Sequence, residues 1–386
     1  MKEKRSASSR RRFRRDLDET QKKKTERGKR LNRNASKEKR LPFSPPLLED
    51  ASRVRAAVER SGLAGNELNF ANVYLLQEKH RTTIAFRDGF FFRHYGGQRL
   101  AGYGFPIGDG SENDVESALR AIFNDAESRG RAPRICLATR TQAATLRRLF
   151  PGKFRFSCDR GDADYLYSTE RTAGLIGRRM HRKRNAIKRF GKERPGLRVE
   201  ELCVENLAAA ALVAERWRGE RPDADSPELT AEARALERAF ELFGALNLFG
   251  ELVLDDDEPL GFALLSATSN LVCDEHFEKA TPDGAASYPL LCRSAARLAL
   301  ERGARWLNRE EDLNSQGLRS AKTAWFPEIL LAKFNAVERA FGDDEPDDFD
   351  VCEAVAANVG EEKTDVSTLE TDRAPMERAP RVNSTK

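Results

Sequence analysis

Residues 247–280 have the sequence NLFGELVLDDDEPLGFALLSATSNLVCDEHFEKA, which contains three consecutive segments typical of β-strands. Residues 247–255 and 259–268 are rich in Leu, Val and Phe, and the acidic turn between them predicts a hairpin. Residues 270–280 supply a third strand in which apolar and ionisable side chains are mixed. Residues 281–303 then read as a loop running into a long helix, and residues 304–310 as a further strand. Only a few mixed α/β folds have this order of elements.

Segments on both sides complete such a domain over residues 169–340. Their periodicity and turn residues predict helices before the hairpin and a helix and a strand after residue 310. These elements are a basic helix at 171–192, a strand at 197–202, helices at 206–220 and 228–246, a short helix at 317–325 and a last strand at 328–337.

Residues 46–168 predict a second mixed α/β domain that precedes it. An Asp88-Gly89 pair joins two strand-like runs within residues 82–97, which is a strong hairpin signal. The other predicted elements are a docking helix beginning near Val54, a helix at 69–81, a loop at 102–111, a helix at 114–130, a strand at 134–139, a helix at 141–150 and a strand-like closing segment at 153–169.

The two ends of the chain are highly charged and contain little to bury. Residues 1–40 carry 18 Lys and Arg against 6 Asp and Glu, whereas residues 343–386 carry 5 against 13. We therefore predict a disordered basic tail at residues 1–45 and a disordered acidic tail at residues 341–386. The basic tail is either simply solvated or touches RNA or anionic lipid.

No long apolar run predicts a membrane helix, and the basic N-terminal run is not followed by an apolar segment. The sequence thus predicts a cytoplasmic protein and leaves open a peripheral position at a membrane. The six cysteines are isolated in the sequence, and none forms a Cys-x-x-Cys motif or a Cys/His motif with the spacing of metal ligands. We therefore predict no metal site.

Four stretches carry a resemblance to a known family: NFANVYLLQEKHRTTIAFRDGFFF, YSTERTAGLIGRRMHRKRNAIKRF, DEHFEKATPDGAASYPL and WLNREEDLNSQGLRSAKTAWFPEILLAKF. Together, over roughly residues 50–337, they resemble the family that shares the C-terminal domain of phosphatidylglycerol lysyltransferases, a group of bacterial proteins. The resemblance implies two tandem GNAT-like acyltransferase domains, related to Fem-type aminoacyltransferases. Those relatives transfer an aminoacyl group from charged tRNA to an amine or hydroxyl. The sequence predicts no multi-span flippase portion, so we expect the acceptor to be either an anionic lipid or a soluble amine or hydroxyl.

The basic helix predicts a phosphate-binding surface. Ile176, Met180, Ile187 and Phe190 form one inward stripe, which leaves the cations on the outer face. Lys and Arg attract phosphate, and Arg binds two of its oxygens at once. Within this helix the substrate-binding candidates are His181, Lys183, Arg184, Asn185 and Lys188. A solvated helix face is the alternative.

The strand 270–280 carries ionisable groups that are costly to bury. Alternation places Asp274, His276 and Glu278 on one face and Cys273, Glu275, Phe277 and Lys279 on the other. A partly wet cleft relieves that cost, whereas a charged edge strand is the alternative. The GNAT-like fold implies a cleft here, with Glu278 as a catalytic candidate and His276 and Lys279 as substrate-binding candidates.

The next strand ends in Asn308, Arg309, Glu310, Glu311 and Asp312. We expect the three adjacent carboxylates to repel one another and to raise at least one pKa, which suits a proton acceptor. The three carboxylates are therefore catalytic candidates, and Asn308 and Arg309 are substrate-binding candidates. Two further binding candidates, Arg319 and Lys322, hold anionic oxygens or instead neutralise the carboxylates.

The overall prediction is an acyltransferase that uses aminoacyl-tRNA as donor. An acetyl-CoA-dependent N-acetyltransferase is the alternative from the same fold, although the turn at 281–288 contains Gly284 but lacks the Gln/Arg-x-x-Gly-x-Gly/Ala pattern. A non-catalytic RNA-binding protein is the alternative from another class. No cofactor is predicted with certainty.

Overall fold

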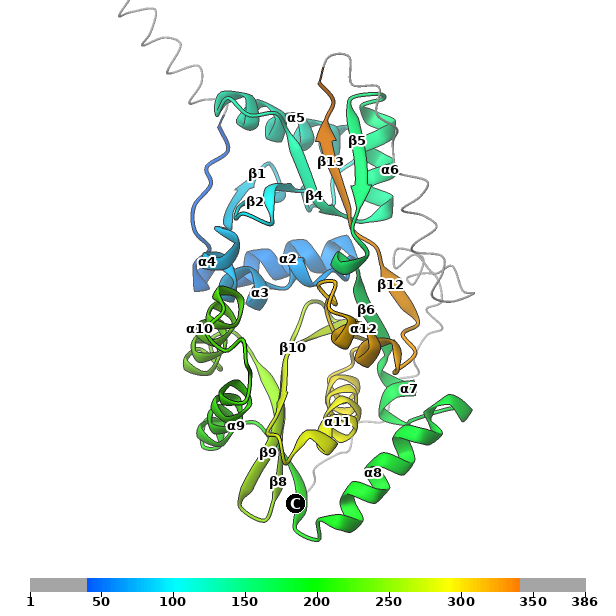
Figure 1. The fold of residues 1–386 in the computed structure, drawn as a ribbon. Coiled ribbons are helices and arrows are strands. Elements are labelled where there is room, and N and C mark those ends of the chain that lie inside the picture. The colour runs from blue at the N-terminus through cyan, green and yellow to red at the C-terminus, as the bar shows by residue number, and fades with distance from the viewer. Residues whose placement is uncertain (1–39, 341–386) are drawn as a thin grey trace, which may run out of the picture.

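The structure is a computed structural model that describes residues 40–340. Apart from residues 40–45, both predicted tails lie outside the described residues. Two mixed β-sheets lie one above the other, and helix α2 (Ala51–Ser61) crosses between them (Figure 1). In the described part of the chain, no helix is long and apolar enough to cross a membrane.

The first sheet has the order β1 (Thr83–Arg87), β2 (Phe90–Gly96), β3 (Ala101–Gly104), β4 (Arg134–Ala138), β13 (Phe334–Glu338) and β5 (Phe154–Cys158). The predicted hairpin is confirmed: β1 and β2 are antiparallel, and Asp88 and Gly89 both have positive φ. Helices α5 (Glu112–Ser128) and α6 (Arg140–Leu149) pack on the core of this half.

Strand β3 corrects the predicted loop at 102–111. It pairs with β2 and lies parallel to β4. Its Gly102 has a φ of 140°, and a Cβ there would lie 2.7 Å from the Arg134 carbonyl oxygen. A short strand that needs glycine for close packing shows no alternation of apolar side chains, so the pattern could not reveal it.

The second sheet has the order β12 (Ile329–Leu331), β6 (Asp164–Ser168), β11 (Trp306–Asn308), β10 (Val272–Ala280), β9 (Glu258–Ala267), β8 (Phe249–Asp255) and β7 (Leu197–Glu201). The predicted hairpin and third strand are confirmed, because β8, β9 and β10 are successively antiparallel. Helices α9 (Leu207–Gly219) and α10 (Pro227–Glu241) lie on one face, and α11 (Tyr288–Glu301) lies on the other (Figure 1).

Two strands are exchanged between the halves of the chain. Strand β6 lies in the second sheet between β11 and β12, and β13 lies in the first sheet between β4 and β5. The single last strand predicted at 328–337 is therefore wrong, since it is divided into β12 and β13 in different sheets. The division into domains at residues 168 and 169 remains a prediction, and the exchange shows that the two sheets are interleaved.

A shared core joins the halves. Helix α2 and helix α3 (Phe70–Leu75) bury Val54, Val58 and Phe70 against residues from both sheets, among them Phe91 and Phe262. A separate core under α5 and α6 and another under α11 complete the layers. The burial of one continuous apolar cluster fixes the first half against the second.

Candidate active site

The site lies where two parallel strands separate. Strands β10 and β11 pair over three positions and stop at Asp274 opposite Asn308. The next two residues of the chain then point to opposite faces: Arg309 contacts carboxylates toward α11, and Glu310 contacts α3. The strands separate where the sequence predicted a cleft, and the cleft itself stays a prediction.

On the α11 side, Arg309 binds two buried carboxylates. Its Nη2 donates to Glu278 at 2.5 Å, and its Nε donates to Glu275. Burial raises the pKa of Glu278 to about 8, although the Arg309 charge opposes this shift. One oxygen of each glutamate and one of the nearby Glu251 have no hydrogen-bond partner among the described residues. Two buried carboxylates share the Arg309 guanidinium, and this arrangement favours a proton on Glu278 at neutral pH.

A β-bulge corrects the predicted faces of β10. The register of β10 against β9 shifts between Glu275 and Phe277. Glu278 therefore lies on the same side as Glu275, and Phe277 and Lys279 turn toward α9 and α10. Lys279 pairs with Glu232 of α10 and lies over the Trp217 ring, away from Arg309. Simple alternation fails because the bulge adds one residue to the strand.

On the α3 side, Glu310 meets a chain of polar groups. Its Oε1 accepts a hydrogen bond from Asn72 at 2.7 Å and lies 3.3 Å from His276 Nδ1. The other ring nitrogen of His276 lies 2.7 Å from the Ser266 hydroxyl, which donates to Asn69 at 3.0 Å. The order Ser, His and Glu resembles a nucleophilic triad, but Ser266 is buried at 3% exposure and its proton is directed to Asn69.

Glu311 and Asp312 are tied into the loop after β11. Burial would raise the pKa of Asp312, but hydrogen bonds from Arg319 and Tyr165 outweigh it and lower this pKa to about 2. Lys333 similarly outweighs the burial of Glu311 and lowers its pKa. Neither Glu311 nor Asp312 shows the raised pKa that was expected for at least one of the three carboxylates, because each has cationic or hydrogen-bond partners that the sequence pattern does not reveal.

The remaining predicted residues of this region make structural hydrogen bonds to backbone carbonyls and to neighbouring side chains. Lys322, on α12 (Gln316–Thr323), donates to the carbonyls of Arg309 and Glu311, both at 2.5 Å. Asn308 is fully buried and donates to Asp164 and to the Ala64 carbonyl. Of the two predicted partners, Arg319 thus neutralises Asp312, whereas Lys322 fixes the chain around Arg309.

The basic helix is confirmed in outline as α7 (Thr169–Ala173) and α8 (His181–Glu193), joined by a short loop. Met180 and Phe190 face inward, but Ile176 is 49% exposed, which corrects the predicted stripe. Ile176 lies in the loop, where helical spacing no longer applies.

Only part of α8 reaches the cluster around Arg309. Lys183 lies 4.6 Å over the Trp325 ring, and burial lowers its pKa while the charges of Arg309 and Glu278 act on it. Arg184 donates to the carbonyls of Leu175 and Gly177. His181 and Asn185 contact each other on the exposed side of the helix, and Lys188 is also exposed.

Several residues of the cluster were not singled out from the sequence. Asn66, Asn69 and Asn72 come from one segment of the first half and reach the second. Their spacing of three residues within an otherwise apolar run is the signal that could have revealed them. The buried ion pair of Lys333 with Asp164, at 2.6 Å, depends on the strand exchange and leaves no such pattern.

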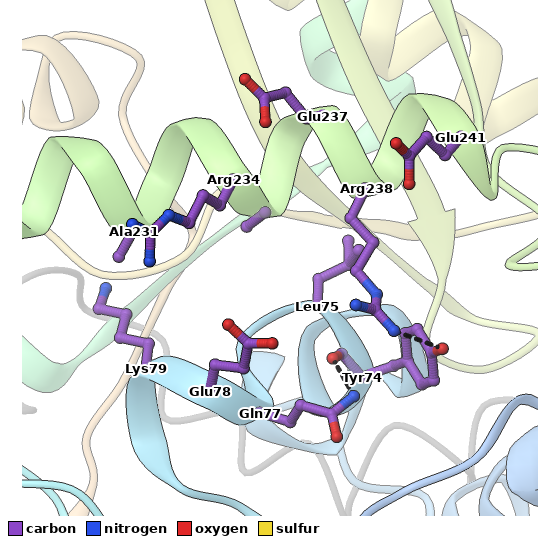
Figure 2. A pocket seen from close by; sticks show the side chains of 11 residues that line it. Tyr74, Leu75, Gln77, Glu78, Lys79, Ala231, Arg234, Glu237, Arg238 and Glu241 are labelled. Carbon is purple, nitrogen blue, oxygen red and sulfur yellow. Dashed lines mark hydrogen bonds between the residues drawn. The ribbon is translucent and has the colours of Figure 1, made fainter.

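A pocket of about 450 Å³ lies elsewhere, between α3, α4 (Gln77–His80) and α10. Figure 2 shows Lys79 and Arg234 on one side of it and Arg238 bonded to Tyr74 on the other. None of the predicted site residues lines this pocket. Among the described residues, no cluster of His, Cys, Asp and Glu has the arrangement of a metal site.

The interleaved mixed sheets and the strand pair that separates at Arg309 define a tandem GNAT-like acyltransferase fold. The chain belongs to the family described as "Phosphatidylglycerol lysyltransferase, C-terminal", which matches residues 59–337.

Solved structures agree with this assignment. A conserved protein of unknown function from Bacteroides thetaiotaomicron VPI-5482 is 25% identical with a TM-score of 0.73, covering 78% of this chain and 100% of its own. The C-terminal domain (DUF2156) of a protein assigned as a lysylphosphatidylglycerol synthetase from Agrobacterium fabrum is 15% identical with a TM-score of 0.55, covering 80% and 95%. No curated protein matches the sequence.

Proposed function

We propose that this protein transfers an aminoacyl group from charged tRNA to an amine or hydroxyl acceptor in the opening between β10 and β11. The observation that carries the proposal is the Arg309 cluster at the point where these strands separate, with Glu278 and Glu275 on it and Lys183 beside it. The family supports acyl transfer: its name concerns lysyl transfer to phosphatidylglycerol, and the similar Agrobacterium fabrum protein is assigned as a lysylphosphatidylglycerol synthetase.

The chemistry follows from the groups at the opening. The acceptor nitrogen or oxygen attacks the ester carbonyl carbon of the donor, a new C–N or C–O bond forms, and the C–O bond to the terminal ribose breaks. Ionised Glu278 takes the proton of the nucleophile and passes it to the ribose oxygen as that oxygen leaves. A raised pKa makes Glu278 a stronger base than an ordinary carboxylate once it is ionised.

The outer cations of α8 hold the phosphates of the tRNA in this proposal. Arg182 and Lys188 are exposed and have no acidic partner among the described residues, which leaves them available for phosphate. Lys183 connects this surface to the Arg309 cluster. The acceptor is either an anionic lipid at a membrane surface or a soluble molecule.

Acetyl-CoA is the second candidate donor, and one observation weighs against it. The turn before α11 is packed rather than open, because a Cβ on Gly284 would lie 2.2 Å from the Leu260 carbonyl oxygen. Pro289 in the first turn of α11 also removes a backbone N–H that would bind phosphate.

The test offers the purified full chain radiolabelled aminoacyl-tRNA pools or acetyl-CoA, with phospholipid vesicles and a mixture of soluble amines. We expect label transfer from charged tRNA and its loss in Glu278→Gln. Glu258→Gln serves as a control, since Glu258 pairs with Arg216 away from Arg309. Transfer from acetyl-CoA alone would replace the proposal with an N-acetyltransferase, and RNA binding without transfer from either donor would favour a non-catalytic protein.

A further inference from the structure

Glu310, after β11, has one carboxylate oxygen held by two partners and one oxygen without a hydrogen-bond donor among the described residues. Its Oε1 faces two nitrogen atoms, Asn72 Nδ2 at 2.7 Å and His276 Nδ1 at 3.3 Å. Its Oε2 has no donor among the described residues, and 22% of the side-chain surface remains exposed. A carboxylate held in this way has a fixed direction and one oxygen available to a ligand.

The contacts of His276 fix the orientation of its ring beside Glu310. Because Nδ1 faces a carboxylate oxygen, it carries a proton. The Ser266 hydroxyl has one proton and donates it to Asn69, whose oxygen also accepts from the Ala71 N–H. His276 Nε2 lies 2.7 Å from the same hydroxyl, so the ring is held from both sides and its Nδ1 faces Glu310 Oε1.

Neighbouring cations do not occupy the free oxygen. The ammonium of Lys322 donates to the carbonyls of Arg309 and Glu311, and no ion pair joins it to Glu310 in the described residues. Arg309 is directed to the opposite face by Glu275 and Glu278. Asp274 is buried near Glu310 and is a carboxyl group, so it does not supply a cation for the free oxygen either.

We infer that His276 and Asn72 are positioning residues that hold Glu310 so that its free oxygen binds an ammonium group of the substrate. The inference rests on the proposed function and gives the donor a chemical property, namely an acyl group with a free amine. It also assigns a role to the first half of the chain, because Asn72 belongs to α3.

The site thereby separates two tasks between two carboxylates. Glu310, held by Asn72 and His276, anchors an ammonium, whereas Glu278 on the opposite side of the strand pair exchanges a proton. An N-acylated amino acid or a plain acetyl group lacks the cation that Glu310 would bind. These ligands would bind more weakly, because each would lose the charge-assisted hydrogen bond to Glu310, and the site would therefore select an acyl group with a free amine.

The experiment measures binding of alaninamide and N-acetylalaninamide to the full chain by NMR titration, independently of transfer. We expect saturable binding of alaninamide only, and weakening by about tenfold or more in Glu310→Gln, which keeps size and removes charge. Glu258→Gln is the matched control. Equal binding of both probes, no binding of alaninamide, or an unchanged Kd in Glu310→Gln would overturn the inference.

The positioning roles have their own measurements. Asn72→Ala leaves the carboxylate intact, so we expect a several-fold weaker Kd, and His276→Gln should retain more binding than His276→Leu because it keeps an N–H. Alaninamide binding that depends on Glu310 without any tRNA-dependent transfer would reject the proposed function alone.

Discussion

At the scale of single residues, burial and partners assign different properties to carboxylates that look alike in the sequence. Glu278 is buried with an excess of negative charge and has a raised pKa, whereas Asp312 is surrounded by donors and has a lowered one. Both were candidates for proton transfer on sequence grounds. Their environments favour Glu278 for that task and Asp312 for holding the loop.

Glu278 should make folding stability depend on pH. Its pKa rises from 4.5 to about 8 on folding, so the folded state binds this proton more tightly. The stabilisation is fully present below pH 4.5 and is lost as the pH rises through about 8. In urea unfolding between about pH 5 and pH 8, Glu278→Gln should lose less free energy of unfolding than the wild type. Equal slopes in the two proteins would contradict the assignment, and Glu258→Gln should match the wild type.

Asp312→Asn should destabilise the protein through its arginine partners. Asp312 accepts two hydrogen bonds from Arg319, at 2.8 and 2.9 Å, and pairs with Arg160 at 3.2 Å. Removing the buried charge leaves these cations uncompensated, and we expect a loss of about 2–4 kcal/mol in the free energy of unfolding. Asp283→Asn, at an exposed turn residue, should change it little. A loss under about 1 kcal/mol for Asp312→Asn would show that the loop is held by other contacts.

At the scale of elements, β10 and α8 carry the site. The bulge in β10 brings Glu278 to the side of Glu275 while His276 faces Ser266. The sequence indicated both elements and the carboxylate-rich segment after β11, because charge within a buried strand and unbalanced charge on a helix are visible in the pattern. It did not indicate the bulge or β3, because both depend on how neighbouring backbones fit.

Charge reversal on α8 should test its role in RNA binding. Arg182→Glu with Lys188→Glu should lower tRNA affinity and reduce the slope of log K against log salt by about 2, because two phosphate contacts are lost. Fluorescence anisotropy with labelled tRNA at several salt concentrations measures both quantities. Arg234→Glu on α10, at the separate pocket, is the control. An unchanged slope in the double variant would place RNA elsewhere on the protein.

At the scale of the whole molecule, the exchanged strands make the two sheets interdependent. Lys333 lies between β12 and β13 and is 2% exposed, with Asp164 at 2.6 Å and Glu67 at 3.1 Å. This ion cluster joins the point where β6 crosses to the second sheet with the point where β13 crosses to the first. The tandem fold followed from the family resemblance, but the exchange did not, because strand partners far apart in the chain leave no local signal.

Lys333→Ala should weaken both sheets together. Asp164 and Glu67 would remain buried without their cation, and we expect a loss of about 3–5 kcal/mol. Because each sheet contains a strand from the other half of the chain, circular dichroism and tryptophan fluorescence should report one common unfolding transition for wild type and variant. Two separated transitions would show that the halves unfold independently, and Lys153→Ala, at a partly exposed pair with Glu338, should cost much less.

The strand exchange also determines when the first sheet can be completed during synthesis. Strands β4 and β5 are synthesised early, but the strand that lies between them in the finished sheet, β13, comes last in the described chain. In a growing chain on the ribosome, the edges of β4 and β5 that pair with β13 therefore stay unpaired until residue 338 has left the exit tunnel. During that interval two strand edges are exposed to wrong partners, so holdase chaperones would find their substrate in the nascent first half rather than in the completed protein.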